Sequence, residues 1–312
     1  MHRLKIISGH LSPSGSSDYR RDLWRSECGS GSGSGPAGSS GPDDVVVVHG
    51  RRTAIGRAKR GSFKDTTPDE LLSAAMTAVL TDVGLSPNLL GDVCVGNVLQ
   101  PGAGALMARV AHFLSGFPET VPVYTVNRQC SSGLQALFNI AGAIRSKSID
   151  LGLACGVESM SLRSIGNPGD LSSRLVDNDK ARDCIIPMGI TSESVAGEAA
   201  GLRYGPVRPE IVPVTTRRLS KLRPAFKPDG STTAGNSSQV SDRAAAVLIG
   251  RRSAVEAMGL PVLGVLRASA VVGVPPDVMG IGPAYAILQL WNKRLRCWFN
   301  YFLFKDDSCP ES

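Results

Sequence analysis

The sequence predicts an α/β fold in which a sheet is layered between helices. Short runs rich in β-branched residues alternate with longer stretches whose apolar residues recur at helical spacing. Aliphatic residues, Ala and Gly are plentiful, whereas aromatic residues make up only 5% of the 312 residues, which suits close packing of helices on a sheet. A chain of this length can bury a sizeable core and suggests one to two domains.

The predicted elements begin at about Asp43 and follow one another along the chain. Strands are expected at Val45–Val48, Val93–Gly96, Val121–Val126, Ile149–Cys155 and Ala244–Ile249. The unbroken β-branched run Val45–Val48 is typical of a strand covered on both faces. Helices are expected from Thr67 to Gly84, from Leu106 to Leu114, and after Cys130, where Leu134, Leu137, Ala141 and Ile144 share one face. Thr67–Glu70 has the pattern of a capping box, and Gly84 can end that helix.

Charge and residue usage exclude several classes of function. The net charge of +7 is spread without a dense Lys/Arg block, so nucleic-acid binding is not expected, although a phosphorylated coenzyme suits the excess. Seven cysteines without a Cys-x-x-Cys pair fit a reducing compartment. The four histidines lack ligand spacing, so no metal site is predicted, and we interpret His49 and His112 as packing residues. No apolar run is long enough to span a membrane.

Cys130 is the predicted catalytic residue. It lies where the expected strand Val121–Val126 gives way to a helix, so its thiol meets the unpaired N–H groups and positive dipole end of that helix, which favour the thiolate. The small residues Ser131, Ser132 and Gly133 leave room for a bulky acyl group. The alternative is a buried structural cysteine. The strand, the turn and the helix start together favour a nucleophile.

Three segments carry a resemblance to a known family. Asn127–Gly133 (Asn-Arg-Gln-Cys-Ser-Ser-Gly) resembles the nucleophile motif of thiolases, and Gly156–Ser161 (Gly-Val-Glu-Ser-Met-Ser) resembles the segment that follows it. Ser231–Asp242 resembles their coenzyme A loop. The likeness covers roughly residues 44–287 with gaps and is strongest to the peroxisomal branch of the family in animals. It implies the thiolase fold, a layered α/β/α sandwich made of two related halves.

The resemblance also implies a function. Thiolases of this branch are acyltransferases of peroxisomal fatty-acid β-oxidation, and they transfer an acyl group through a cysteine thioester, here Cys130, to coenzyme A. The expected partners are 3-ketoacyl-CoA, coenzyme A and acetyl-CoA, with no permanently bound cofactor, and a second copy in a homodimer. Ser238 would contact the pantetheine arm, or else belong to a plain surface turn. A ketoacyl synthase-like condensing enzyme shares the fold and a cysteine elbow, but Asn127-Arg128 and Ala234–Ser238 favour a thiolase.

The implied domain organisation has an N-terminal thiolase domain at residues 43–261, including a shortened loop region at about 160–230. Residues 262–287 would begin the second half, and residues 288–312 form an unrelated aromatic-rich tail. The Gly-His-Pro and Asn-Glu-Ala-Phe motifs, which supply an acid/base group and donors in the second half of the family's fold, do not occur in the sequence. The family's Cys-x-Gly motif also belongs to that second half, and none occurs after residue 261; Cys94-Val95-Gly96 has this spacing but lies in an expected strand of the first half. We therefore expect at most trace thiolysis, and a truncated isoform that only pairs with other subunits is an alternative. Arg243 stands where the family has glycine and is expected to strain a tight turn.

The N-terminus has the pattern of a targeting segment. Arg3-Leu4 and His10-Leu11 are separated by five residues and resemble the peroxisomal import signal of the thiolase family. Leu4, Ile7 and Leu11 would lie on one face of a short helix, which suits the groove of an import receptor. The resemblance implies that the presequence comprises residues 1–28, and residues 29–42 are the expected Gly/Ser-rich linker. A mitochondrial presequence is the alternative.

We predict that residues 1–11, fused to a fluorescent reporter, direct it to peroxisomes, because Arg3-Leu4 and His10-Leu11 have the spacing of the import signal that they resemble. Changing Arg3 and His10 to Ala should leave the reporter in the cytosol. Fluorescence microscopy against a peroxisomal marker checks this. Mitochondrial staining, or import that survives both changes, would contradict it.

Overall fold

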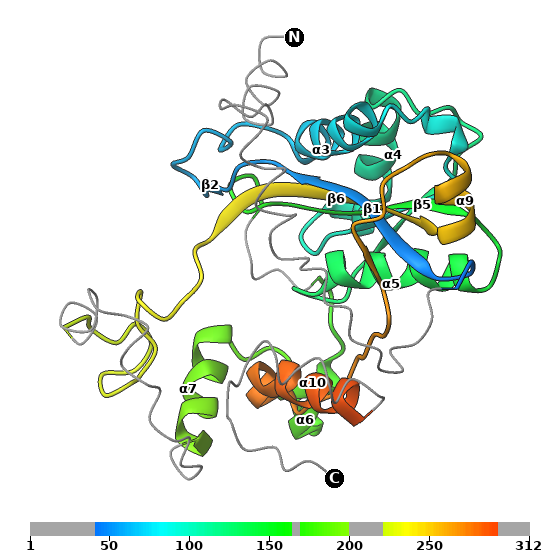
Figure 1. Cartoon of the computed structure of the whole chain (residues 1–312). Helices are drawn as coiled ribbons and strands as arrows, with labels where there is room; N and C mark the ends of the chain where they lie inside the picture. Colours follow the sequence, from blue (N-terminus) through cyan, green and yellow to red (C-terminus); the bar gives the residue numbers. More distant parts are fainter. Residues whose placement is uncertain (1–40, 164–168, 200–220, 293–312) are drawn as a thin grey trace, which may run out of the picture. The chain divides into compact units, whose positions relative to one another are not determined.

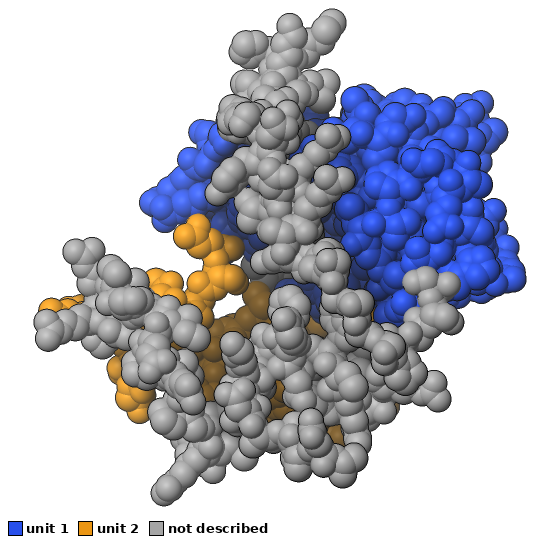
Figure 2. All heavy atoms as spheres, in the orientation of Figure 1, with its two compact units in different colours: residues 1–167, 240–267 blue, residues 168–239, 268–312 orange. Residues whose placement is uncertain are grey.

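The computed structural model describes residues 41–163, 169–199 and 221–292, which fall into two units (Figures 1 and 2). Unit 1 is the described part of residues 1–167 together with residues 240–267, and unit 2 is the described part of residues 168–239 and 268–312. The predicted presequence, nearly all of the linker and most of the predicted tail lie outside the described residues. The predicted domain boundaries stay predictions.

Unit 1 is built on a mixed sheet of seven strands (Figure 1). The strands are β1 Val45–Arg52, β2 Gly56–Arg57, β3 Asp92–Gly96, β4 Val123–Val126, β5 Leu151–Ser159, β6 Ser241–Arg251 and β7 Gly264–Val265. Their order is β4-β3-β5-β6-β1-β7, and β2 pairs with β6. The pairs of β3 with β4 and β5 are parallel, and the others are antiparallel. All five predicted strands are confirmed, with ends shifted by a few residues.

Helices cover both faces of this sheet. In Figure 1, α3 and α4 lie on one face and α5 lies on the other. The helices of unit 1 are α3 Pro68–Val83, α4 Ala105–Leu114, α5 Ser132–Arg145 and α9 Arg252–Ala257. Those of unit 2 are α6 Asp179–Asp183, α7 Met188–Ala199 and α10 Gly282–Asn292. Short 3-10 helices are η1 Pro87–Leu89, η2 Pro101–Gly104, η3 Ser173–Asp177 and η5 Pro276–Ile281. The predicted α/β layering is therefore confirmed.

The two faces of the sheet carry separate apolar cores. Val46 and Val48 pack in the cluster that contains the α3 side chains, whereas Val45 packs with Ile140 and Ile144 of α5. Each of these five side chains is at most 2% exposed. Fully burying an aliphatic side chain stabilises the fold by about 1.5–3 kcal/mol. The expectation that β1 is covered on both faces is confirmed.

Two details of the helices differ from the sequence prediction. Thr67 makes no side-chain capping bond, so the predicted capping box is wrong, although Gly84 does end α3 in the left-handed conformation (φ 64°). On α5, Ala141 and Ile144 are buried as expected, but Leu134 is 52% exposed, and the inward positions are Ser132, Ala136 and Ile140. The helix approaches the sheet so closely at its start that only small side chains fit there.

That close approach depends on three glycines. A Cβ on Gly96 would lie 2.3 Å from the carbonyl carbon of Ser132, and a Cβ on Gly156 would lie 3.3 Å from the Cα of Gly133. Gly96 and Gly156 are register partners in β3 and β5, and Gly133 is in the first turn of α5. The absence of side chains at these positions lets the start of α5 rest on the ends of the two strands.

We predict that Gly96→Ala destabilises unit 1 by about 1–3 kcal/mol, because the added methyl would overlap the backbone of Ser132. Gly142→Ala is the matched control, since a Cβ on this exposed glycine of α5 meets nothing within 4 Å. It should raise the free energy of unfolding by roughly 0.5–1 kcal/mol, because alanine loses less conformational entropy than glycine in a helix. Denaturant unfolding of the two variants checks this. Equal stability of both would contradict the close-approach argument.

Candidate active site

Cys130 lies at the turn between β4 and α5, and its side chain is exposed. The helix begins at Ser132, so the sulfur belongs to the segment just before the first helical turn. Gln129 has φ 47°, a left-handed conformation that residues with a side chain rarely adopt. Such backbone persists only where the surroundings hold it, and it clusters at functional sites. The predicted elbow is thus present in the structure.

Polar side chains of the motif hold the turn. The Ser132 hydroxyl donates to the Gln129 carbonyl (2.5 Å) and accepts from the Arg128 N–H (2.9 Å). The Ser131 hydroxyl donates to the Arg128 carbonyl at 2.8 Å, and the Asn127 side-chain oxygen accepts from the Gln129 N–H at 3.0 Å. Sequence reasoning treated Ser131 and Ser132 only as small residues. In the structure they also lock the strained peptide next to Cys130.

Sequence reasoning missed several polar residues near the elbow. Asn97 and Gln100, in the loop after β3, are only 3% and 6% exposed, and Glu158 is half-buried near the end of β5. The ends of β3, β4 and β5 meet at one edge of the sheet because these strands are parallel. The signal was available for Glu158, a charged residue in an otherwise apolar strand. Asn97 and Gln100 lie in a loop that offers no periodic pattern.

Arg243 is not in a tight turn, which corrects the sequence prediction. Strand β6 begins at Ser241, so Arg243 lies within it, directly opposite Glu158 in the register. Its side chain is exposed, whereas its neighbours Asp242 and Ala244 are buried. A strand residue with an exposed cation needs no special backbone and keeps its hydration. The expected conformational strain therefore does not arise.

Ser238 lies in unit 2 and is exposed. The turn that precedes it is braced at two points. Glu193 of α7 accepts hydrogen bonds from the N–H groups of Ser231 (2.8 Å) and Thr232 (2.9 Å). Asn236 accepts from the Thr233 N–H at 2.7 Å and donates to the Ser231 carbonyl at 2.9 Å. Sequence reasoning missed Glu193, which has no periodic signal. Cys130 and Ser238 thus belong to different units, and each has its own local support.

The hydrogen bonds to Glu193 also act on its acidity. Donation by the Ser231 and Thr232 N–H groups lowers the pKa of the Glu193 carboxyl below its ordinary value, because these bonds favour the charged form.

Both described histidines are engaged away from the elbow. His112 is fully buried and stacks on Phe117 with ring centroids 4.4 Å apart, which confirms a packing role. Burial, reinforced by the nearby Arg109 cation, lowers the pKa of His112 to about 4. His49 differs from the prediction, because its ring nitrogen forms a partly exposed hydrogen bond of 2.9 Å with the Asp82 carboxylate.

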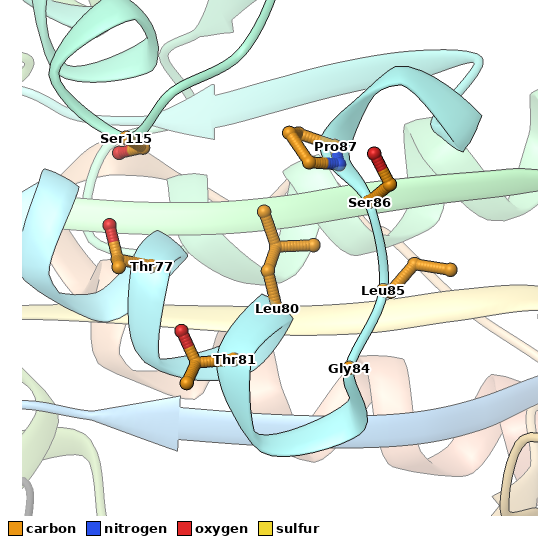
Figure 3. Close-up of a pocket in the computed structure, with 8 residues that line it drawn as sticks. All are labelled: Thr77, Leu80, Thr81, Gly84, Leu85, Ser86, Pro87 and Ser115. Atoms are coloured by element: carbon orange, nitrogen blue, oxygen red, sulfur yellow. The ribbon is translucent and has the colours of Figure 1, made fainter.

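Other classes of site find no support in the described part of the chain. No group of three His, Cys, Asp or Glu residues there could hold a metal ion. None of the helices described is both long and apolar enough to cross a membrane. One open hollow of about 500 Å³ lies at the end of α3 and is lined mainly by Thr77, Leu80, Thr81, Pro87 and Ser115 (Figure 3). Its lining has no acid, base or thiol, so it offers no catalytic chemistry.

Comparison with known proteins decides the family. The model of the thiolase N-terminal domain matches residues 45–203 and 209–253, and a curated relative is 58% identical over 332 aligned positions. The chain belongs to the thiolase family. That relative is the rat peroxisomal 3-ketoacyl-CoA thiolase B, and the alignment covers 92% of this chain and 77% of the relative. Because 332 positions exceed the 312 residues of this chain, the relative has aligned segments that this thiolase lacks.

Solved thiolases share the fold. The dimeric peroxisomal thiolase of Saccharomyces cerevisiae superposes with a TM-score of 0.73 at 40% identity, covering 82% of this chain and 76% of the yeast chain. The human mitochondrial 3-ketoacyl-CoA thiolase in complex with CoA gives a TM-score of 0.65 at 30% identity. The match covers 80% of this chain and 75% of the human chain. The predicted thiolase-like fold is therefore confirmed.

We predict that Cys130 is the fastest of the four described cysteines to react with iodoacetamide. Cys94 and Cys155 are buried, and burial raises the pKa of both thiols, that of Cys94 to about 11. At pH 8 such a thiol is ionised to only about 0.1%. Cys184 is exposed like Cys130, but its thiol donates a hydrogen bond to the Lys180 carbonyl at 3.3 Å, a bond that is lost when the thiolate forms.

Mass-spectrometric mapping after brief labelling checks this, with Cys184 as the internal control. Faster labelling of Cys94 or Cys155 would mean that the core is open. Equal rates for Cys130 and Cys184 would mean that the start of α5 does not activate the sulfur.

We predict that the Ser231 and Thr232 amide protons shift together on acidification, because both N–H groups donate to Glu193. The pKa of this carboxyl is lowered, so its bonds stabilise the loop fully above the ordinary value of 4.5 and are lost as the pH falls through the lowered pKa. An NMR titration checks this, and Glu193→Gln should abolish the transition. A midpoint above 4.5 would contradict it.

Proposed function

We propose that this chain acts as a peroxisomal 3-ketoacyl-CoA thiolase with Cys130 as its nucleophile. The observation that carries the proposal is an exposed thiol on a strained strand-to-helix turn, in a chain 58% identical to a thiolase of that name. A helix N-terminus favours negative charge nearby, and Cys130 lies two residues before the first residue of α5. The curated relatives, such as the rat and human proteins, are named 3-ketoacyl-CoA thiolases. These names favour a thiolase over the two alternatives, a ketoacyl synthase and an inactive subunit that only pairs with active ones.

The reaction follows from the chemistry of a thiolate. The Cys130 sulfur attacks the C3 carbonyl of a 3-ketoacyl-CoA, the C2–C3 bond breaks, and the departing enolate takes up a proton to become acetyl-CoA. The shortened acyl group is left on the sulfur as a thioester. The thiol of coenzyme A then attacks this thioester, and the bond between the acyl carbon and the Cys130 sulfur breaks, which regenerates the thiolate. The proton that the coenzyme thiol releases replaces the one that the enolate took up. Coenzyme A is a substrate in this scheme and no resident cofactor is needed.

Ser238 is the proposed contact to the pantetheine arm of coenzyme A. Its turn contains Ala234, Gly235 and Ser237, whose small side chains allow backbone groups to approach a thin chain. The bonds from Glu193 and Asn236 keep the start of this turn in one conformation, which lowers the entropy lost on binding. The complex of the human mitochondrial thiolase with CoA supports coenzyme A as the ligand.

Acid/base groups limit the expected rate. Thiolysis needs one base for the coenzyme thiol and one acid/base group for the substrate α-carbon. Both histidines among the described residues are engaged elsewhere, His49 with Asp82 and His112 with Phe117. We therefore expect acyl transfer onto Cys130 to be measurable, but full turnover to be slow, since each such group typically contributes about 10²–10⁴-fold.

Localisation and partners follow the same family. We assign the chain to the peroxisome, with an import receptor as a transient partner of its N-terminus and a second copy as its lasting partner. Apolar side chains on the outer face of α4 support self-association, since Leu106, Val110 and Phe113 are exposed at helical spacing. Within the described residues, β4 has a neighbouring strand on one side only. The yeast relative is dimeric.

We predict that incubation with acetyl-CoA places an acetyl group on Cys130. The new bond joins the acetyl carbon to the sulfur, the bond to the coenzyme sulfur breaks, and coenzyme A leaves as its thiol. This step needs no base at a substrate α-carbon, so the two histidines placed elsewhere do not prevent it. Peptide mass spectrometry should locate the acetyl group, and added coenzyme A should remove it.

Cys130→Ala is the control. The only acetylation expected in this variant is the slow background reaction of exposed residues such as Cys184. Loss of the magnesium–enolate absorbance of a 3-ketoacyl-CoA, measured in parallel, reports full thiolysis. Acetylation of Cys184 at the same rate, or thiolysis that survives Cys130→Ala, would contradict the proposed role of Cys130.

A further inference from the structure

Glu158 binds one loop with both of its carboxylate oxygens. One oxygen accepts from the backbone N–H groups of Val98 (2.9 Å) and Leu99 (3.1 Å), and the other accepts from the Gln100 side-chain nitrogen (2.8 Å). All three donors follow β3 directly. Glu158 is half-buried and Gln100 is almost fully buried, so water competes little for these bonds.

The far side of the same loop has an unusual backbone conformation that a second side chain supports. Gly102, Ala103 and Gly104 all have positive φ, and the space beside Gly104 is filled by the Asn97 amide, which donates to the Ala103 carbonyl at 3.0 Å. Ala103 is held at φ 56° although it carries a Cβ. Because its backbone conformation is held at these points, the loop can pass the position set by Glu158 on to the segment that it contacts next.

That contact is with the elbow. The Asn127 side-chain nitrogen donates to the Val98 carbonyl (3.4 Å), and its oxygen accepts from the Gln129 N–H (3.0 Å). The Asn97 N–H also donates to the Val126 carbonyl at 3.2 Å. A continuous path therefore runs from Glu158 through Val98 and Asn127 to Gln129, whose strained peptide precedes Cys130.

We propose that Glu158 is a positioning residue for Cys130. It does not touch the sulfur. It fixes the Val98 peptide, which orients Asn127, and Asn127 holds Gln129 in the left-handed conformation that presents the thiol at the start of α5. The inference rests on the proposed role of Cys130 and adds a residue that supports the elbow geometry from another strand. Because the path consists of hydrogen bonds, the side chain at position 158 must supply oxygen atoms that accept from the loop after β3.

The test is the rate of Cys130 alkylation by iodoacetamide in the full chain. Glu158→Ala should slow it by about tenfold, since small misplacements of a reacting group can cost up to about 10²-fold. Asn127→Ala should slow it equally, and the double variant should be no slower, because both changes break one path. Glu158→Gln should stay within about twofold, since its amide oxygen can accept from Val98 and Leu99 while Gln100 turns its own amide to accept.

Controls separate positioning from loss of fold. Glu256→Ala removes an exposed carboxylate of α9 and should leave the Cys130 rate unchanged. Labelling of buried Cys94 and Cys155 must stay slow in every variant. Should Glu158→Ala unfold, Asn127→Ala and Glu158→Gln still decide. An unchanged rate in Asn127→Ala, additive effects in the double variant, or a Glu158→Gln variant as slow as Glu158→Ala would overturn the proposal.

The labelling requires neither coenzyme nor turnover. A chain that forms no acyl-enzyme but shows this pattern of rates refutes the proposed function and leaves the positioning role standing. A chain that is acylated on Cys130 in all variants at the same rate supports the function and refutes the positioning role.

Discussion

The contact between the start of α5 and the ends of β3 and β5 is the constraint on which the rest of unit 1 depends. Gly96 and Gly156 remove the side chains that would hold the helix away, and Gly133 completes the contact from the helix side. Once the helix is that close, the chain between β4 and α5 must reverse within the five residues 127–131. A side-chain residue, Gln129, is then forced into the left-handed region. The close packing of α5 on the sheet and the strained conformation beside Cys130 thus have the same origin.

Polar side chains keep the strained turn from relaxing. Ser131 and Ser132 bond within the turn, and Asn127 ties it to the loop after β3. In unit 2, Glu193 and Asn236 support the turn before Ser238 in a comparable way. Two carboxylates act alike: Glu158 accepts from two backbone N–H groups of the loop after β3, and Glu193 accepts from two in the turn before Ser238. Such bonds cost little reorganisation when a ligand arrives, because the loop is already in one conformation.

The strands and the nucleophile were predictable from sequence because their signals are local. Val45–Val48 and Val93–Gly96 are short apolar runs, and Cys130 lies between a strand pattern and a helix pattern. The inward face of α5 was not predictable from hydrophobicity, since the buried positions include Ser132 and Ala136 while Leu134 faces solvent. The missing information was the distance between helix and sheet, which glycines on three different elements set jointly.

Arg243 and Glu158 show why the supporting residues escaped sequence reasoning. Glu158 stands out in the sequence as a charge in an apolar strand, but the groups that it and Arg243 face are known only once the strands are paired. Their pairing joins β5 to β6 across more than eighty residues of chain. The same holds for Glu158 and Val98, which lie sixty residues apart. A catalytic cysteine carries its signature in its own neighbours, because the turn and the helix start adjoin it. A residue that positions it acts through contacts between distant segments. It becomes visible only when the sheet has brought the ends of β3, β4 and β5 together.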